Sequence, residues 1–137
     1  MVGALGWVWA RIRIREGAGR SDGFGTADSS VWTGLTVALA AVEAARLIGL
    51  SPRGLTAAVE GFGAVGGAAA AFLAAEGVRI VAVSTARGAA RREKGFAIEA
   101  LEAARDEAGP RFVDDMPGAD RIGLEELLEL EVDILVP

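Results

Sequence analysis

The sequence predicts an α/β fold: a partial doubly wound parallel sheet with helices on both faces. Short apolar runs of strand length alternate with longer alanine- and leucine-rich runs of helix length, which is the pattern of strands joined by crossover helices. A glycine-rich turn separates the first clear strand from the helix behind it. A last apolar run, residues 132–136, supplies another strand, so the predicted sheet amounts to little more than half of a doubly wound one.

The turn is Gly61-Phe62-Gly63-Ala64-Val65-Gly66, with G-x-G-x-x-G spacing. Residues 55–59 before it form a short apolar run, residues 67–76 after it predict an alanine-rich helix ending at Gly77, and residues 78–83 predict a second strand. In such a unit the first glycine allows the tight turn, the second admits a pyrophosphate, and the third lets the helix pack closely. The stretch therefore predicts a Rossmann-like dinucleotide-binding unit, although a tight turn needs glycine even without a phosphate.

Two regions precede this unit. Residues 10–15 alternate between apolar and basic side chains, which predicts a half-buried strand, and residues 16–25 read as a glycine-rich loop. Trp7 and Trp9 are expected to pack within the chain or in a dimer. Residues 1–27 are thus set apart from a Rossmann-like domain at 28–137.

The remaining elements follow from apolar spacing and breaker residues. The domain is expected to open with a long helix over about 31–47, for which Asp28, Ser29 and Ser30 are candidate N-caps. Beyond the second strand the sequence predicts a loop at 84–95 with three arginines, an amphipathic helix at 96–107, a short strand at 111–113, an acidic helix at 124–130 and the strand at 132–136.

Composition narrows the class of protein. A hydrophobic content of 52% with 24% charged residues is typical of a globular domain. No uncharged apolar run is long enough to span a membrane, and no signal peptide is visible, so a cytoplasmic location is expected. The absence of Cys, Asn and Gln fits a thermophile or a GC-rich genome. No basic, aromatic-rich patch indicates nucleic-acid binding.

The residue types that are missing exclude much catalytic chemistry. The chain has no Cys or His, and Lys94 is its single lysine. An imidazole base, a thiol nucleophile and a Cys/His metal site are therefore excluded. No catalytic and no metal-binding residues are predicted.

Several segments together resemble the NAD(P)-binding domain of the glutamate/leucine/phenylalanine/valine dehydrogenases. They are Thr33-Gly34, the glycine turn, Val81-Ala82-Val83-Ser84, Arg87-Gly88, Glu125-Glu126-Leu127-Leu128-Glu129-Leu130 and Val132-Asp133-Ile134-Leu135-Val136-Pro137. The resemblance runs from about residue 28 to the end, in the family's order. It implies a domain of an NAD(P)-dependent amino acid oxidoreductase, usually an oligomer.

This sequence departs from the family's pattern at three places. Ala64 stands where the family has an asparagine that touches the nicotinamide end, and Ser29 stands where it has an arginine. No acidic residue follows the second predicted strand to hold the adenosine ribose. The family's substrate domain, with its catalytic lysine and aspartate motifs, is not found in the 137 residues, and Lys94 matches neither motif.

The resemblance implies that the chain binds NADP or NAD weakly. The nine candidate binding residues are Gly61, Phe62, Gly63, Ala64, Val65, Gly66, Ser84, Arg87 and Thr33. Arg87, together with Arg91 or Arg92, would either pair with a 2′-phosphate or remain a solvated charge in the loop. Ser84 would either contact a ribose or cap the end of the strand. Glu60, before the first glycine, mildly disfavours a phosphate.

Three functions remain open. The first is a stand-alone, truncated dinucleotide-binding domain that is not catalytic by itself. The second is a regulatory or interaction module that associates with a complete dehydrogenase. The third is one part of an oxidoreductase completed by another chain. A homodimer is expected, because a partial sheet leaves an edge open.

Overall fold

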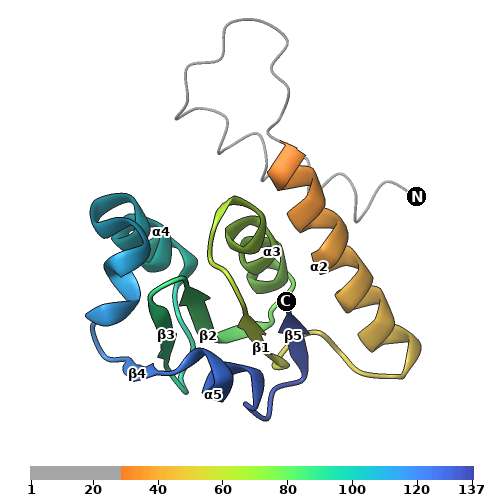
Figure 1. The fold of residues 1–137 in the computed structure, drawn as a ribbon. Coiled ribbons are helices and arrows are strands. Elements are labelled where there is room, and N and C mark those ends of the chain that lie inside the picture. Colours follow the sequence, from red (N-terminus) through yellow and green to blue (C-terminus); the bar gives the residue numbers. More distant parts are fainter. Residues whose placement is uncertain (1–28) are drawn as a thin grey trace, which may run out of the picture.

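The computed structural model describes residues 29–137 and confirms the α/β class. A five-stranded sheet lies at its centre, with the strand order β4-β3-β2-β1-β5 (Figure 1). The strand and the glycine-rich loop expected within residues 1–27 lie outside the described residues.

The elements are α2 (Ser29–Leu47), β1 (Thr56–Val59), α3 (Ala64–Ala75), β2 (Arg79–Thr85), β3 (Gly88–Arg91), α4 (Ile98–Ala108), the 3-10 helix η2 (Gly109–Asp114), β4 (Asp120–Ile122), α5 (Leu124–Leu128) and β5 (Ile134–Val136). The predicted strand–helix–strand unit is β1, α3 and β2, with β1 parallel to β2. Helix α3 starts at Ala64, three residues earlier than predicted, because the last residues of the glycine motif form its first turn.

The sheet has the predicted parallel core, and two antiparallel pairings that were not predicted make it mixed. Strand β1 is parallel to both β2 and β5, β3 is antiparallel to β2, and β4 is antiparallel to β3. Strand β3 lies inside the stretch 84–95 that was predicted to be a loop. Ala89 and Ala90 of this strand are buried, but alanine is depleted in strands, so composition gave no strand signal there.

The region after α4 also differs from the prediction. Residues 111–113 lie in η2 rather than in a strand, and Phe112 and Val113 use this 3-10 turn to reach the core. Pro110 is in the first turn of η2, where its fixed φ suits a helix and its missing N–H is not needed. Strand β4 was not predicted, because it is three residues long and only Ile122 of it is buried.

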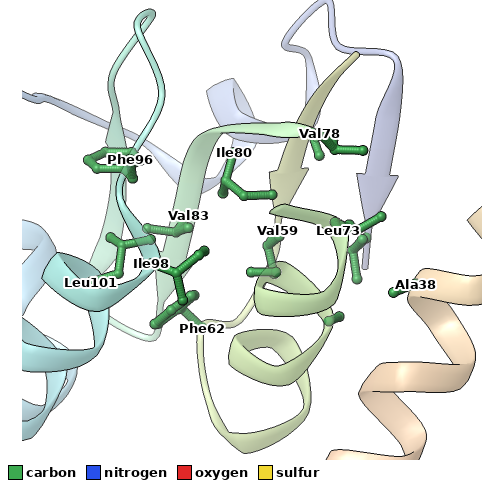
Figure 2. Packing of buried hydrophobic residues seen from close by; sticks show 14 of the residues in the cluster. Ala38, Val59, Phe62, Leu73, Val78, Ile80, Val83, Phe96, Ile98 and Leu101 are labelled. Carbon is green, nitrogen blue, oxygen red and sulfur yellow. The ribbon is translucent and has the colours of Figure 1, made fainter. Parts of the chain in front are cut away.

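Helices cover both faces of the sheet, as predicted, but unequally. On one face, α3, α4 and η2 enclose the larger core, where Leu73 and Leu101 of the helices pack against the strands (Figure 2). Its strand residues are Ala57, Val59, Ile80, Val83, Ala90 and Val136. The other face carries a small cluster under α5, formed by Ala58, Ala82, Ala89, Ile122 and Leu127. Helix α2 packs mainly along α3, at the side of the sheet (Figure 1).

Asp133 ties the start of β5 to the start of β1. Its Oδ2 accepts hydrogen bonds from the Thr56 N–H at 2.8 Å and from the Thr56 hydroxyl at 3.0 Å. These bonds lower the pKa of Asp133 from its ordinary value, against a smaller opposing effect of desolvation. Because the folded-state pKa is depressed, the contact adds stability above the unfolded pKa of about 4 and loses it as pH falls through the folded value.

We therefore expect Asp133→Asn to lower the urea midpoint of unfolding at pH 6 and to differ less from the wild type at pH 3. Other carboxylates titrate in the same range, so the difference between variant and wild type is the quantity to follow by circular dichroism. Asp120→Asn, at an exposed aspartate that begins β4, is the matched control. The same pH-dependent loss in both variants would contradict the role of the contact with Thr56.

Candidate functional site

Four strands end at the same edge of the sheet. Strands β1, β2, β4 and β5 share one direction, so their carboxyl ends lie together. Strand β1 lies between β2 and β5; the chain reaches β2 through α3 on one face and reaches β5 after α5 on the other. The carboxyl end of β1 is thus a topological switch point, the place where open α/β sheets bind ligands.

The glycine turn follows β1 at this point, and Ser84 of β2 holds it in place. The Gly61 N–H donates to the Ser84 hydroxyl at 2.9 Å, and the Phe62 N–H donates to the Ser84 carbonyl at 2.7 Å. Ser84 is only 1% exposed. Its two oxygen atoms therefore join the carboxyl ends of β1 and β2.

The three glycines of the motif are glycines for different reasons. Gly61 has a φ of 81°, in the left-handed region that side chains rarely adopt. A Cβ at Gly66 would lie 2.0 Å from the Gly61 carbonyl oxygen and 3.1 Å from Val59 Cγ1, so only glycine lets α3 approach β1 this closely. Among the described residues, no atom lies within 4 Å of a Cβ built at Gly63, and its φ of −94° suits other residues. Nothing in the described part of the fold requires glycine at position 63.

Helix α3 presents its amino end to solvent beside Gly63. The N-cap residue Gly63 has no side chain to cap the helix, and no acidic residue lies in the first turn. The N–H groups of Ala64, Val65 and Gly66 precede the first intrahelical hydrogen bond, which joins the Gly67 N–H to the Gly63 carbonyl at 2.8 Å. Ala64 and Val65 are exposed. This arrangement offers N–H donors and the positive end of the helix dipole to an anion.

Phe62 points from the turn into the core. It is 2% exposed, and its ring meets the ring of Phe112 edge-on with centroids 5.8 Å apart. The guanidinium of Arg105 lies 5.6 Å from the Phe62 ring centroid. The side chain of Phe62 therefore anchors the turn, and only its main chain lies at the edge of the sheet.

Thr33 lies where α2 crosses the first turn of α3. A Cβ at the neighbouring Gly34 would lie 2.7 Å from the Val65 carbonyl oxygen and 2.6 Å from Ala68 Cβ, so the two helices touch closely there. Thr33 itself is exposed, and its hydroxyl donates to the Ser29 carbonyl at 2.9 Å. The fold thus places Thr33 next to the contact between α2 and the first turn of α3.

Arg87 lies in the short turn between β2 and β3, at the same edge. Its Nη2 is 3.5 Å from Asp114 Oδ2, and Arg121 Nη2 is 3.0 Å from Asp114 Oδ1. Desolvation raises the pKa of Asp114, but the hydrogen bonds and charges of the two arginines outweigh it, so the pKa lies below its usual value. Sequence reasoning missed both Asp114 and Arg121, because no local motif shows that β4 carries Arg121 to Arg87.

The other basic residues of the predicted loop are not brought to Arg87. Arg91 ends β3, away from the turn that carries Arg87. The Arg92 N–H donates to the Val81 carbonyl at 2.8 Å, and Lys94 follows toward the opposite edge of the sheet, where β2 begins. Neither Arg91 nor Arg92 shares a cluster with Arg87.

The main-chain N–H donors and guanidinium groups at this edge are anion ligands, and the Asp114 carboxylate lies against the two guanidinium groups. In the part of the chain that the structure describes, no group of three acidic side chains is placed to hold a metal ion. No helix in that part is long and apolar enough to cross a membrane.

The sequence profile of the Glutamate/Leucine/Phenylalanine/Valine dehydrogenase family matches residues 25–137. The chain belongs to this family. Every described element, from α2 to β5, lies within the matched range. Of the residues at which the sequence departs from the pattern that the resemblance implied, Ala64 is the first residue of α3 and Ser29 is the first residue of α2.

Two glutamate dehydrogenases are among the relatives of this family member. That of Thermotoga maritima is 44% identical over 106 residues, 77% of this chain and 25% of its own length. That of Aeropyrum pernix is 41% identical over 107 residues, 78% of this chain and 25% of its own length. The chain thus spans about a quarter of these dehydrogenases.

A solved structure of the same kind shares the fold. The hetero-hexameric glutamate dehydrogenase from Thermus thermophilus, in its Leu-bound form, superposes with a TM-score of 0.65 and 33% identity. The match covers 77% of this family member and 24% of the Thermus chain.

Proposed function

We propose that residues 28–137 are the NAD(P)-binding domain of this dehydrogenase-family chain and that the glycine turn holds the pyrophosphate of NADP or NAD. The observation that carries the proposal is the open space at Gly63. Gly61 and Gly66 are explained by the fold, whereas the absence of a side chain at Gly63 leaves room for a ligand above the amino end of α3. A dinucleotide pyrophosphate is the anion that this arrangement suits.

The candidate residues take different roles in this proposal. Gly63, Ala64 and Val65 contact the pyrophosphate through their main chain, while Gly61, Phe62 and Gly66 shape the turn. We assign Ser84 to support of the turn rather than to the ribose, because its buried hydroxyl already accepts the Gly61 N–H. Thr33 lies on the side of the turn expected to face the nicotinamide, and Arg87 lies on the adenosine side.

The test is a calorimetric titration of the 137-residue chain with NADH and NADPH at low salt. We expect saturable binding of at least one of them, with a Kd in the micromolar range. No binding of either at millimolar concentration would contradict the proposal and leave the turn as a structural feature only.

Catalysis would require groups that residues 29–137 do not bring to the turn. The single lysine, Lys94, lies toward the opposite edge of the sheet, and the proposed domain by itself is not an amino acid dehydrogenase. Turnover would then depend on a substrate-binding part outside these 137 residues. Following NADH formation from NAD and glutamate tests this dependence: we expect none with the 137 residues alone, and formation only after addition of a glutamate dehydrogenase whose own dinucleotide site has been disabled by mutation.

A second candidate function is association with dehydrogenase subunits. Helix α2 packs along α3 but exposes Trp32, Leu39 and Leu47 on its outer side, and the following Ile48 is 74% exposed. An apolar surface of this kind suits a protein partner, either a second copy or a complete dehydrogenase in the cytoplasm. The hetero-hexameric Thermus enzyme supports the second choice. Light scattering of the chain alone, and of its mixture with a complete dehydrogenase, would distinguish a homodimer from a mixed assembly.

A further inference from the structure

Two guanidinium groups converge on one carboxylate at the carboxyl edge of the sheet. Arg121 reaches Asp114 Oδ1 with Nε at 3.1 Å and Nη2 at 3.0 Å, and Arg87 reaches Oδ2 with Nη2 at 3.5 Å. The two arginine side chains remain 54% and 57% exposed, whereas that of Asp114 is 29% exposed. The cluster therefore carries two accessible cations for one more enclosed anion.

The fold fixes Arg121 over the β2–β3 turn. Its Nη2 also donates to the Arg87 carbonyl at 3.0 Å. Gly88 makes room for it, because a Cβ there would lie 3.3 Å from Arg121 Nη2. Arg121 comes from β4, two strands away from β2, so the contact depends on the antiparallel strand β3 between them.

The cluster is connected to the glycine turn through Ser84. Arg87 follows Ser84 by three residues, and Ser84 accepts hydrogen bonds from Gly61 and Phe62. In dinucleotide-binding sheets the group just after the second strand meets the adenosine ribose, as an acid for a 2′-hydroxyl or an arginine for a 2′-phosphate. Here the residues after Ser84 are Thr85, Ala86 and Arg87, none of them acidic.

We propose that Arg87 and Arg121 together bind the 2′-phosphate of a 2′-phosphorylated dinucleotide, and that Arg121 is the specificity-determining residue that sequence motifs do not reveal. Asp114 holds the two guanidinium groups in place when no phosphate is bound. A phosphate dianion offers more acceptor oxygens than a carboxylate, so it is able to accept hydrogen bonds from both planar guanidinium groups. This inference rests on the proposed function, since it concerns the adenosine end of the same ligand.

The experiment titrates the 137-residue chain with adenosine 2′,5′-bisphosphate and with 5′-AMP, and in parallel with NADPH and NADH. We expect the 2′-phosphorylated member of each pair to bind about tenfold tighter. Arg121→Ala should remove most of this preference, and Arg121→Lys, which keeps the charge but not the fork, should retain part of it. Arg53→Ala is the matched control, because this exposed arginine precedes β1, at the opposite edge of the sheet from the cluster, and it should leave the preference unchanged.

The outcomes separate this inference from the proposed function. Equal binding of NADH and NADPH, or a preference that survives Arg121→Ala, would overturn the role of Arg121 while the dinucleotide site stands. Tighter binding of NADH, weakened by Asp114→Asn, would show that the carboxylate serves a 2′-hydroxyl and would also overturn it. Absence of binding for all four nucleotides would overturn both proposals.

Discussion

Gly66→Ala is expected to destabilise the chain more than any other single-methyl change in the glycine turn. The added Cβ would lie 2.0 Å from the Gly61 carbonyl oxygen and 3.0 Å from its carbonyl carbon. Both are backbone atoms in a turn that Ser84 already holds, so neither is able to rotate away. Relief requires α3 to move off β1, which disturbs the larger core. We expect a loss of about 3 kcal/mol or more in the free energy of unfolding.

Gly67→Ala provides the matched control for this prediction. It adds the same methyl group to the next residue of the same helix turn, but the nearest atom there is Arg105 Nη1 at 2.9 Å, the far end of a flexible side chain. Alanine also favours the helix over glycine by up to about 1 kcal/mol, which offsets the displacement of Arg105. Urea unfolding followed by circular dichroism should show a near-normal midpoint for Gly67→Ala and a much lower one for Gly66→Ala. Equal midpoints would mean that the close approach of α3 to β1 is dispensable.

The part of the fold around this turn could be predicted because its signals are local. Residues 55–83 contain an apolar run, three spaced glycines, an alanine-rich run and a second apolar run, and each lies next to the element it joins. Strand β3 offered no such signal, because its buried positions are filled by Ala89 and Ala90, small residues of low strand propensity. These alanines are buried by their neighbours across the sheet rather than by their own hydrophobicity.

The candidate site also contains residues that could be predicted from the sequence and residues that could not. The glycine motif and Arg87 were predicted, since both follow from their places directly after strands. Arg121 was not, because it reaches Arg87 only through the pairing of β4 with β3, and neither strand was expected. Arg91 and Arg92 were linked to Arg87 by closeness in sequence. An antiparallel strand separates them, since each residue along β3 moves the chain about 3.3 Å from the turn.

Gly63→Val is expected to abolish dinucleotide binding while leaving the fold intact. No atom of residues 29–137 would lie within 4 Å of the valine Cβ, and the φ of −94° lies outside the left-handed region. Its side chain would instead fill the space above the amino end of α3, where the pyrophosphate is proposed to lie. We expect an affinity loss on the order of 100-fold, or about 2.7 kcal/mol, for NADH and NADPH alike. Calorimetric titration measures the loss, and a thermal melt checks the fold.

Gly123→Val is the control for Gly63→Val. It shows whether a valine at the N-cap of any helix lowers the affinity, or only a valine at the proposed binding site. Gly123 is the N-cap of α5, has a φ of −76°, and likewise has open space where a Cβ would lie. It follows β4, three strands from β1, or roughly 14 Å across the sheet. Because NADH carries no 2′-phosphate, its binding should be unaffected by Gly123→Val and lost in Gly63→Val. If Gly63→Val binds NADH normally, the ligand does not pass over the amino end of α3, and the open space at Gly63 has to be explained by something other than a phosphate.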